Sequence, residues 1–262
     1  MPNIPNKIRA SIFEIKLKSL IKPLKIYQPL EKMGENPMLI LIGEAHDKHY
    51  IEQEKLIMNI RPAQILHEGM ENFNIEPGYR IYRRDNDLLY SKEEKECAEI
   101  DDSYYHTFQH IVARLLRSDL VYNSKTTDQI LDELKIRSPF ELHKYFNKRI
   151  FHDTELAKES VKFYFFIKWA LTFNVNFYGA DLTDGEIYKV ANIMKIFAKR
   201  NMKIINKFRE YKMFTVIKQF TRPGDYTLGI FGEDHLEPGS LLISKLKEKN
   251  IPHYLIRCEQ NS

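Results

Sequence analysis

Residues 38–46, Met-Leu-Ile-Leu-Ile-Gly-Glu-Ala-His, hold the pattern that decides the fold, and residues 226–235, Tyr-Thr-Leu-Gly-Ile-Phe-Gly-Glu-Asp-His, repeat it. In each stretch an apolar run ends at a glycine, which predicts a buried strand that stops at a tight turn. A glutamate and a histidine follow each of these strands. Ligands of open α/β sheets bind beyond the carboxyl ends of the strands. The repeat therefore predicts two polar strand ends that meet if both strands belong to one sheet.

Three further apolar runs, at residues 63–67, 174–178 and 253–257, are also predicted to be strands. Helix-like patterns separate them, over residues 48–59, 184–218 and 240–248. Strands that alternate with helices are typical of a parallel sheet. The predicted fold class is α/β, with a mostly parallel central sheet flanked by helices.

The predicted domain organisation is a single α/β domain over residues 38–257, with a polar tail at 258–262. Residues 1–37 are rich in Lys, Pro and Asn, end in a turn signal and are predicted to be an N-terminal extension. Helical patterns dominate residues 74–172, which lack glycine after Gly78. This stretch is predicted to be a helical insertion that forms a cap over the sheet.

The bulk composition excludes several classes of protein. A hydrophobic content of 43% and a mixed surface with a net charge of +4 fit a globular domain and show no basic stripe for nucleic acid. No apolar run is long enough to span a membrane or to form a signal segment, so a cytoplasmic location is expected. Two cysteines give no disulfide framework. The glycine patterns of phosphate-binding and dinucleotide-binding loops are absent, so no nucleotide cofactor is expected.

Acidic and histidine side chains collect at four predicted strand ends that carry a glycine. They are Glu44 and His46; His67 and Glu68; Asp181; and Glu233, Asp234 and His235. Imidazole and carboxylate bind divalent metals, and the same pair can act as general base and orienter for water. Each member also has a structural interpretation, since Glu44 can cap a helix and His67 can be a hydrogen-bonded core histidine. The joint pattern favours a functional site.

A second histidine pair lies within the insertion, where His106 and His110 are four residues apart on a predicted helix. The glutamate of a His-Glu-x-x-His metal motif is missing. Aromatic residues surround the pair, so a packed helix face is the favoured interpretation. His49 is close to His46 in the sequence and is predicted to line the rim of the main site.

Five stretches in order resemble the motifs of the erythromycin esterase/ChaN-like group, which belongs with the TraB, PrgY and TIKI proteins in one superfamily. They are residues 39–49, His67-Glu68-Gly69-Met70, Gly179-Ala180-Asp181, Arg200-Asn201 and Gly232-Glu233-Asp234-His235-Leu236. The resemblance covers residues 38–73 and 175–257. There are two departures: the methionine expected a few residues after the Arg-Asn step is displaced to Met202, and Glu233 takes the place of a small residue.

The resemblance implies more than one activity. Some members of the group hydrolyse a macrolide lactone with histidine and glutamate activating water, others look like metal-dependent proteases, and some bind haem or iron. Kinship at the level of the fold does not choose among these activities.

The leading hypothesis is a hydrolase of ester or amide bonds that acts on a small-molecule or peptide substrate. Its predicted catalytic residues are Glu44, His46, Glu68 and His235, which are also the candidate ligands of a divalent metal (Mn, Co, Zn or Fe) in a site that can equally be metal-free. Its predicted substrate-binding residues are Asp181, Arg200 and His49. His46 is expected to be general base or metal ligand, and Asp181 to orient its neighbours. The positive charge of Arg200 suits an oxyanion or a substrate carboxylate.

Two alternatives remain open. One is a protein that binds haem, iron or a small ligand through the same histidines without catalysis. The other is a divergent protein that keeps the shape of the site for protein interaction.

Overall fold

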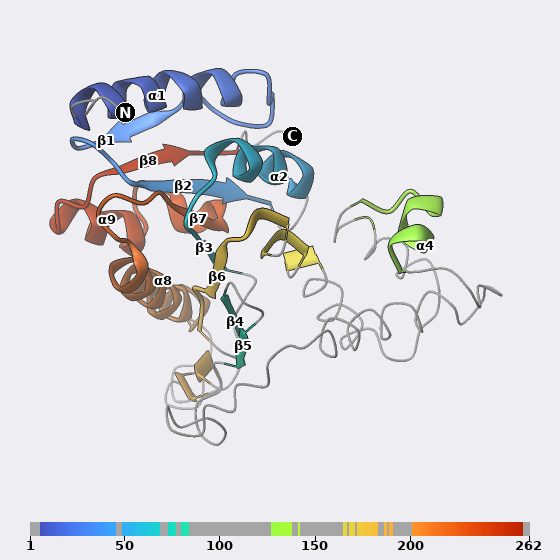
Figure 1. Ribbon diagram of the computed structural model, residues 1–262. Helices are drawn as coiled ribbons and strands as arrows, with labels where there is room; N and C mark the ends of the chain where they lie inside the picture. The colour runs from blue at the N-terminus through green and yellow to red at the C-terminus, as the bar shows by residue number, and fades with distance from the viewer. Residues whose placement is uncertain are drawn as a thin grey trace.

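An eight-stranded sheet lies at the centre of the computed structural model, which describes residues 6–45, 49–68, 73–76, 80–83, 127–137, 141, 165–166, 168–170, 172–182, 186–187, 189–190 and 201–258 (Figure 1). The strands are β1 (Glu31–Met33), β2 (Leu39–Glu44), β3 (Gln64–His67), β4 (Phe73–Glu76), β5 (Arg80–Arg83), β6 (Asn176–Gly179), β7 (Thr227–Gly232) and β8 (His253–Ile256). The helices are α1 (Asn6–Ile21), α2 (Tyr50–Ile60), α4 (Thr127–Glu133), α8 (Asn201–Phe220) and α9 (Leu241–Glu248), with a 3₁₀ turn η2 (Glu233–Leu236). None of the helices in these ranges is long and apolar enough to cross a bilayer.

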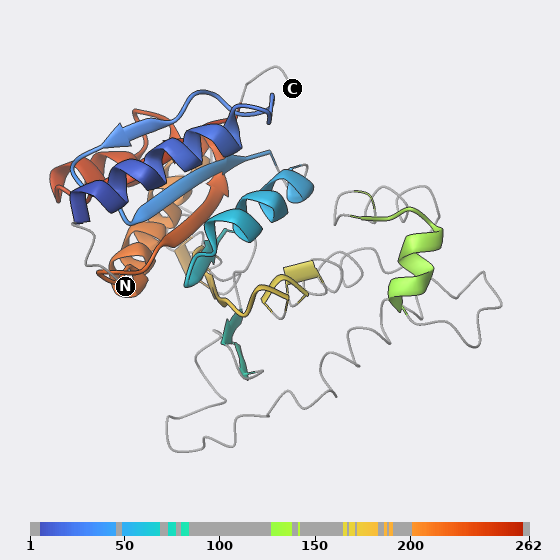
Figure 2. The ribbon, with the colours of Figure 1, turned by 45° about the horizontal axis from the view of Figure 1, so that its top comes forward.

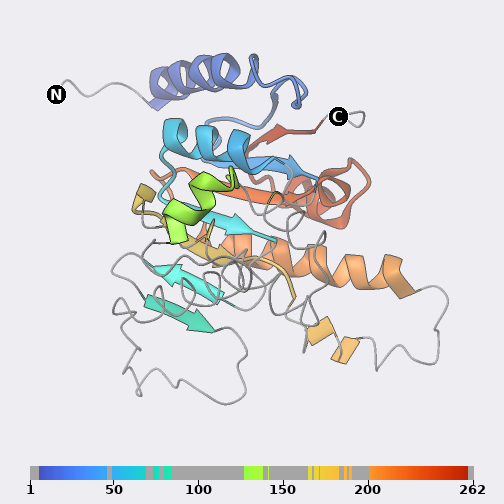
Figure 3. The same cartoon turned by 90° about the vertical axis from the view of Figure 1, so that its right-hand side faces the viewer.

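The strand order is β1-β8-β2-β7-β3-β6-β4-β5, and the five strands from β8 to β6 are parallel. Figure 3 shows β2 and β3 running in the same direction. The outer strands β1, β4 and β5 pair antiparallel. The predicted α/β class with a mostly parallel sheet is confirmed.

The central strands are mostly apolar and buried along nearly their whole length, because helices cover both faces of the sheet. α1 and α2 lie in front of the sheet in Figure 2, and α8 and α9 lie behind it. Ile40 and Ile42 of β2 belong to the core on the α2 face, whereas Leu39 and Leu41 belong to the core on the α8 face. Side chains of a strand alternate between faces, so neighbouring residues enter different cores.

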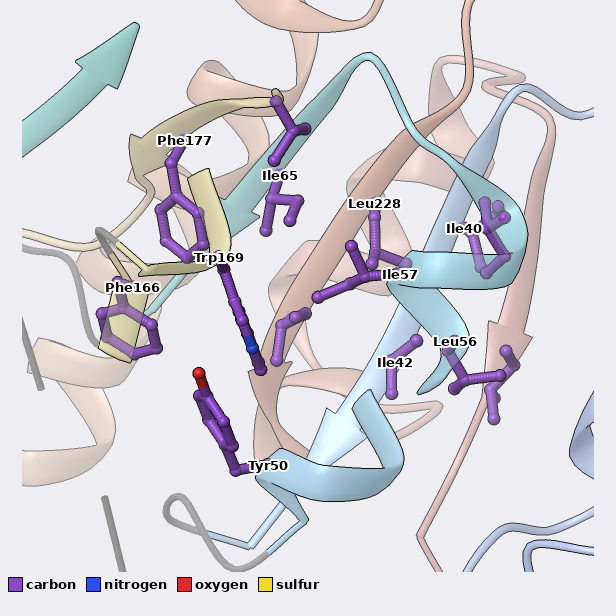
Figure 4. Close-up of a cluster of buried hydrophobic side chains, with 14 of the residues drawn as sticks. Ile40, Ile42, Tyr50, Leu56, Ile57, Ile65, Phe166, Trp169, Phe177 and Leu228 are labelled. Carbon is purple, nitrogen blue, oxygen red and sulfur yellow. The ribbon is translucent and has the colours of Figure 1, made fainter. Parts of the chain in front are cut away.

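Trp169 fills the centre of the core on the α2 face. Figure 4 shows its ring between Tyr50 of α2 and Phe177 of β6. Trp169 is fully buried, and its ring centroid lies 4.1 Å from that of Tyr50 in a stacked arrangement. The residue comes from the end of the predicted insertion, so at least this part of the insertion packs against the sheet.

The boundaries drawn from the sequence differ from the structure in two places. The predicted N-terminal extension contributes β1 to the sheet and buries Leu17 and Ile21 of α1 in the core on the α2 face. The lysines of α1 make this burial hard to predict from the sequence, because they lie on the exposed side of the helix. The predicted helical insertion begins with β4 and β5, which extend the sheet beyond β6. Within the predicted insertion, α4 forms a helix at Thr127–Glu133, while the predicted helix with His106 and His110 lies outside the described residues.

Candidate functional site

The two copies of the Gly-Glu-x-His motif lie on adjacent strands, because β7 inserts between β2 and β3. The register pairs Gly43 with Phe231 and Glu44 with Gly232, so the copies are offset by one residue. The strand end that carries His67 and Glu68 borders the other side of β7. The sequence expectation that these ends meet at one edge is confirmed by the strand order.

The polar residues at this edge separate into two groups, because successive residues of a strand face opposite sides of the sheet. Glu68 contacts Arg209 of α8, on the face that α8 covers. His67, one residue earlier, stacks on Phe177 and contacts the ring of Phe166 in a tilted arrangement, on the face that α2 covers. The structure therefore brings the four predicted strand ends together at one edge but not into one cluster.

We define the His235 cluster as Glu68, Asp181, Arg209, Glu210 and His235, on the α8 face. The His235 ring lies between two carboxylates, with Nδ1 3.2 Å from Glu210 Oε1 and Nε2 3.5 Å from Glu68 Oε1. His235 is 4% exposed, and Glu68 is also largely covered. The 3₁₀ turn η2 directly after β7 places the histidine there. A buried imidazole held by two acids is well suited to hold or transfer a proton.

Arg209 joins the carboxylates of two other strand ends. Its Nη2 donates to Glu68 Oε1 at 2.6 Å, and its Nε donates to Asp181 Oδ2 at 2.8 Å. Asp181 is fully buried and also accepts a hydrogen bond from the backbone N–H of Leu182. These contacts connect β3, β6 and α8 through one guanidinium, whose planar fork matches carboxylates well.

Glu210 is held by α9. Its Oε2 accepts a 2.6 Å hydrogen bond from the backbone N–H of Leu241, the first residue of that helix. The first N–H groups of a helix have no partner within it and attract carboxylates. Glu210 thus has one oxygen fixed by the start of α9 and the other at His235.

The charges of the cluster shift its pKa values in opposite directions. Burial alone would raise the pKa of Glu68, but the hydrogen bond and charge of His235, the Gly232 N–H and Arg209 together lower it to about 2. Burial alone would lower the pKa of His235, but the hydrogen bonds and charges of Glu68 and Glu210 outweigh burial and raise it. The cluster therefore holds an ionised Glu68 beside a His235 whose protonated form is stabilised by its acidic neighbours.

A second group lies on the α2 face and contains Glu44, Gln53 and His67. Gln53 of α2 donates a hydrogen bond of 3.1 Å to Glu44 Oε2, and the same oxygen lies 3.7 Å from His67 Nε2. All three side chains are buried. Gln53 therefore fixes the position of the Glu44 carboxylate beside His67.

Glu233 performs a structural task at the end of β8. Its Oε2 accepts a 2.9 Å hydrogen bond from the backbone N–H of Cys258. The Cys258 thiol donates to the carbonyl oxygen of Gly43 and lies 3.3 Å from His49 Nδ1. Burial raises the pKa of Cys258 to about 12, with a further contribution from Glu233 and Glu44, so the thiol stays protonated. His49 is buried at this contact and does not lie on an open rim.

Both motif glycines face a carboxylate from another part of the chain. A Cβ at Gly43 would lie 1.8 Å from Glu233 Oε2, and a Cβ at Gly232 would lie 3.0 Å from Glu68 Oε2. The Gly232 N–H also donates a hydrogen bond to that same Glu68 oxygen. The absence of a Cβ at these two glycines lets a carboxylate approach the backbone closely.

Two predicted site residues, His46 and Arg200, lie outside the described residues, as do His106 and His110. The described residues place Arg209 and Glu210 at the cluster, and sequence reasoning missed both. They lie inside a long helix, without the turn signal that marks the other members. A signal was nevertheless present. A methionine, Met213, lies three residues after the Arg209-Glu210 step, whereas Met202 follows Arg200-Asn201 directly.

The residues described do not support the predicted divalent metal site, one of whose candidate ligands, His46, lies outside them. Among them, no group of three or more His, Cys, Asp or Glu side chains is arranged to hold a metal ion. Glu68 and His235 are instead engaged with Arg209 and Glu210.

Comparison with known proteins gives one weak likeness of fold. No protein-family model matches the chain, and no curated protein matches it. A solved structure that is similar, described as cofacial heme binding to ChaN of Campylobacter jejuni, has 13% sequence identity and a TM-score of 0.37. The likeness covers 92% of this chain and 91% of that chain. The functional assignment therefore depends on the chemistry of the site itself.

Proposed function

We propose that the chain is a hydrolase of ester or amide bonds in which His235 is the group that transfers a proton. The observation that carries the proposal is a buried imidazole between the carboxylates of Glu68 and Glu210 at the carboxyl edge of a parallel sheet. Burying this many charges costs free energy that apolar side chains would not. Strongly perturbed ionisable groups at such an edge are typical of functional sites.

The two ring nitrogens of His235 have different tasks in this proposal. Nδ1 is bound to Glu210, which is itself fixed by the start of α9, so this side orients the ring. The contact of Nε2 with Glu68, at 3.5 Å, is longer than the 3.2 Å contact of Nδ1 with Glu210, so Nε2 is the nitrogen assigned to proton exchange with substrate. Glu68 keeps the imidazole protonated until the proton is needed.

The reaction combines this acid with a base from the first motif. His46, two residues after Glu44, takes a proton from water as the water oxygen attacks the carbonyl carbon. His235 then donates its Nε2 proton to the leaving oxygen or nitrogen as the carbon–oxygen or carbon–nitrogen bond breaks. Proton return from His46 to His235 through water restores both groups. The products are a carboxylic acid and an alcohol or amine.

Asp181 and Arg209 are positioning residues in this proposal. The fully buried Asp181 holds Arg209, and Arg209 holds Glu68 beside His235. Arg209 also balances the negative charge of Glu68 and Asp181. Removal of Asp181 is expected to act through the position of Glu68.

Binding of haem, iron or a small ligand without catalysis is the competing proposal. A haem iron needs an imidazole nitrogen without its proton. Each ring nitrogen of His235 lies near a carboxylate that favours the protonated ring. The described part of the site therefore supports proton transfer over coordination.

The experiment is hydrolysis of a panel of aryl esters and chromogenic peptides by the purified chain and by His235→Gln. The variant is expected to lose about 10²- to 10⁴-fold in kcat, the usual contribution of a positioned acid or base. His253→Gln is the matched control. His253 is also buried, but it is the first residue of β8 and lies at the amino ends of the parallel strands, opposite the end that carries His235. It is expected to retain a rate within about threefold of the parent, since it takes no part in proton transfer.

Two results would overturn the proposal. One is absence of hydrolysis by the parent chain across the panel. The other is an equal rate in His235→Gln under conditions where circular dichroism shows both proteins folded. An absorption band that forms on haem addition and disappears in His235→Gln would instead support the binding proposal.

A further inference from the structure

Helix α1 is apolar on two opposite sides. Leu17 and Ile21 are buried in the core on the α2 face, with Phe13 and Leu20 packed against them. Ile8, Ile12 and Ile15 are instead 50%, 57% and 70% exposed. Their spacing of four and three residues places them in one stripe along the helix, roughly opposite the buried side. The stripe is therefore not part of the core.

This stripe stands out among the described residues. Six large hydrophobic side chains there are exposed, and three of them belong to this one helix. The other three are Met58 on α2 and Phe208 and Tyr211 on α8. Single exposed hydrophobics need no explanation, but a contiguous apolar stripe marks an interaction surface. Figure 1 shows α1 on the outside of the molecule, beyond β1.

Lysines continue the stripe toward the carboxyl end of α1. Lys18 lies three residues after Ile15 and borders the stripe, and Lys22 follows the last residue of α1 directly. Lys25 lies in the turn after the helix and is exposed, as are Lys18 and Lys22. Residues 10–25 contain four lysines and one acid, Glu14. Since Glu14 is shared by Lys18 and Lys32, it does not neutralise the remaining lysines.

We propose that this face of α1 docks on an anionic membrane surface. Isoleucines that enter the boundary between head groups and acyl chains, with lysines at the level of the head groups, are the pattern of a helix that lies in the interface plane. A second copy of the chain is a poorer partner, because pairing this face with itself would bring its lysines together. Three isoleucines give reversible binding and not permanent anchoring.

The test is flotation of the full chain with vesicles of phosphatidylcholine alone and of phosphatidylcholine with phosphatidylglycerol. Binding is expected to the anionic vesicles, to be at least about tenfold weaker to the neutral ones and to fall with added salt. The variant Ile12→Gln/Ile15→Gln is expected to bind the anionic vesicles about ten- to hundredfold more weakly, since binding strength scales with buried apolar area. Lys22→Glu/Lys25→Glu is expected to lose the preference for anionic lipid.

Phe208→Gln on α8 is the matched control, because Phe208 is also about half exposed but lies on another helix. It is expected to bind vesicles like the parent chain. The proposal is overturned if the parent chain stays unbound on anionic vesicles at low salt. It is equally overturned if Phe208→Gln weakens binding as much as the isoleucine variant does. A dimer that dissociates in Ile12→Gln/Ile15→Gln, without vesicle binding, would show a second copy as the occupant instead.

Discussion

At the scale of single residues, each motif glycine makes room for a carboxylate. The place of Gly43 is explained by Glu233 of the other motif copy, and the place of Gly232 by Glu68, the residue directly after β3. The sequence predicts a turn at both glycines. It gives no signal of the approaching carboxylates, because those belong to residues far away in the chain. The glutamates of the two Gly-Glu-x-His copies therefore have different roles. Glu44 lies on the α2 face, while Glu233 accepts a hydrogen bond from the Cys258 N–H just after β8.

Gly43→Ala is expected to destabilise the fold by about 1–3 kcal/mol, because Glu233 must swing away and leave the Cys258 N–H without its acceptor. Urea denaturation of both single variants and of Gly43→Ala/Glu233→Ala measures the coupling between the two positions. The double variant is expected to lose less than the sum of the single losses. Strictly additive losses would show that the predicted clash does not occur.

The lowered pKa of Glu68 predicts a dependence of stability on pH. A carboxyl whose pKa falls from 4.5 to about 2 on folding stabilises the native state above pH 4.5, and this contribution disappears as the pH falls toward 2. The parent chain is expected to lose roughly 2–3 kcal/mol more than Glu68→Gln between pH 5.5 and pH 2.5. Urea denaturation at the two pH values measures the difference.

Glu248→Gln is the control for this measurement. The pKa of Glu248 is also lowered to about 2, by Lys245 and Lys249, but the side chain is exposed to solvent. Solvent screens exposed ion pairs, so this variant is expected to keep the pH dependence of the parent chain. If Glu68→Gln also keeps it, Glu68 is not held as described.

At the scale of elements, the apolar runs predict all five parallel strands, and their alternation with helices predicts the fold class. The sequence does not predict the strand order, because the position of β7 between β2 and β3 depends on long-range packing. α8 also escapes prediction as a source of site residues. Arg209 and Glu210 occupy successive positions of a regular helix, where a charged residue is usually a solvated one. Only the fold shows that they point toward the carboxyl edge.

The packing of α1 predicts that the N-terminal segment is part of the folded domain. Leu17→Ala is expected to cost about 2–4 kcal/mol, since Leu17 is 1% exposed in the core. Ile15→Ala on the same helix is expected to change the free energy of unfolding by less than about 0.5 kcal/mol, because Ile15 is 70% exposed. Thermal or urea unfolding compares them. Equal and small effects would show α1 to be an extension after all.

At the scale of the whole molecule, the sheet brings the polar strand ends to one edge but places their side chains on two opposite faces. The sequence predicts that the strand ends converge, and this is correct for the edge as a whole. It cannot predict that Glu68 and His235 lie on one face while Glu44 and His67 lie on the other, because the face of a residue depends on where its strand ends. The residues that carry the proposed proton transfer therefore come from β3, η2 and α8.

The central claim is that His235 donates a proton and that Glu68 and Glu210 keep it protonated. The most direct test is the pH dependence of kcat/KM for an ester substrate, in the parent chain and in Glu210→Gln. The pKa of His235 is raised by its acidic neighbours, so the rate is expected to fall on the alkaline side as the pH passes above 6.5. Loss of the Glu210 charge lowers that pKa, so the alkaline limb is expected to move to lower pH. An alkaline limb that stays in place in Glu210→Gln, or a rate without an alkaline limb, would contradict the claim.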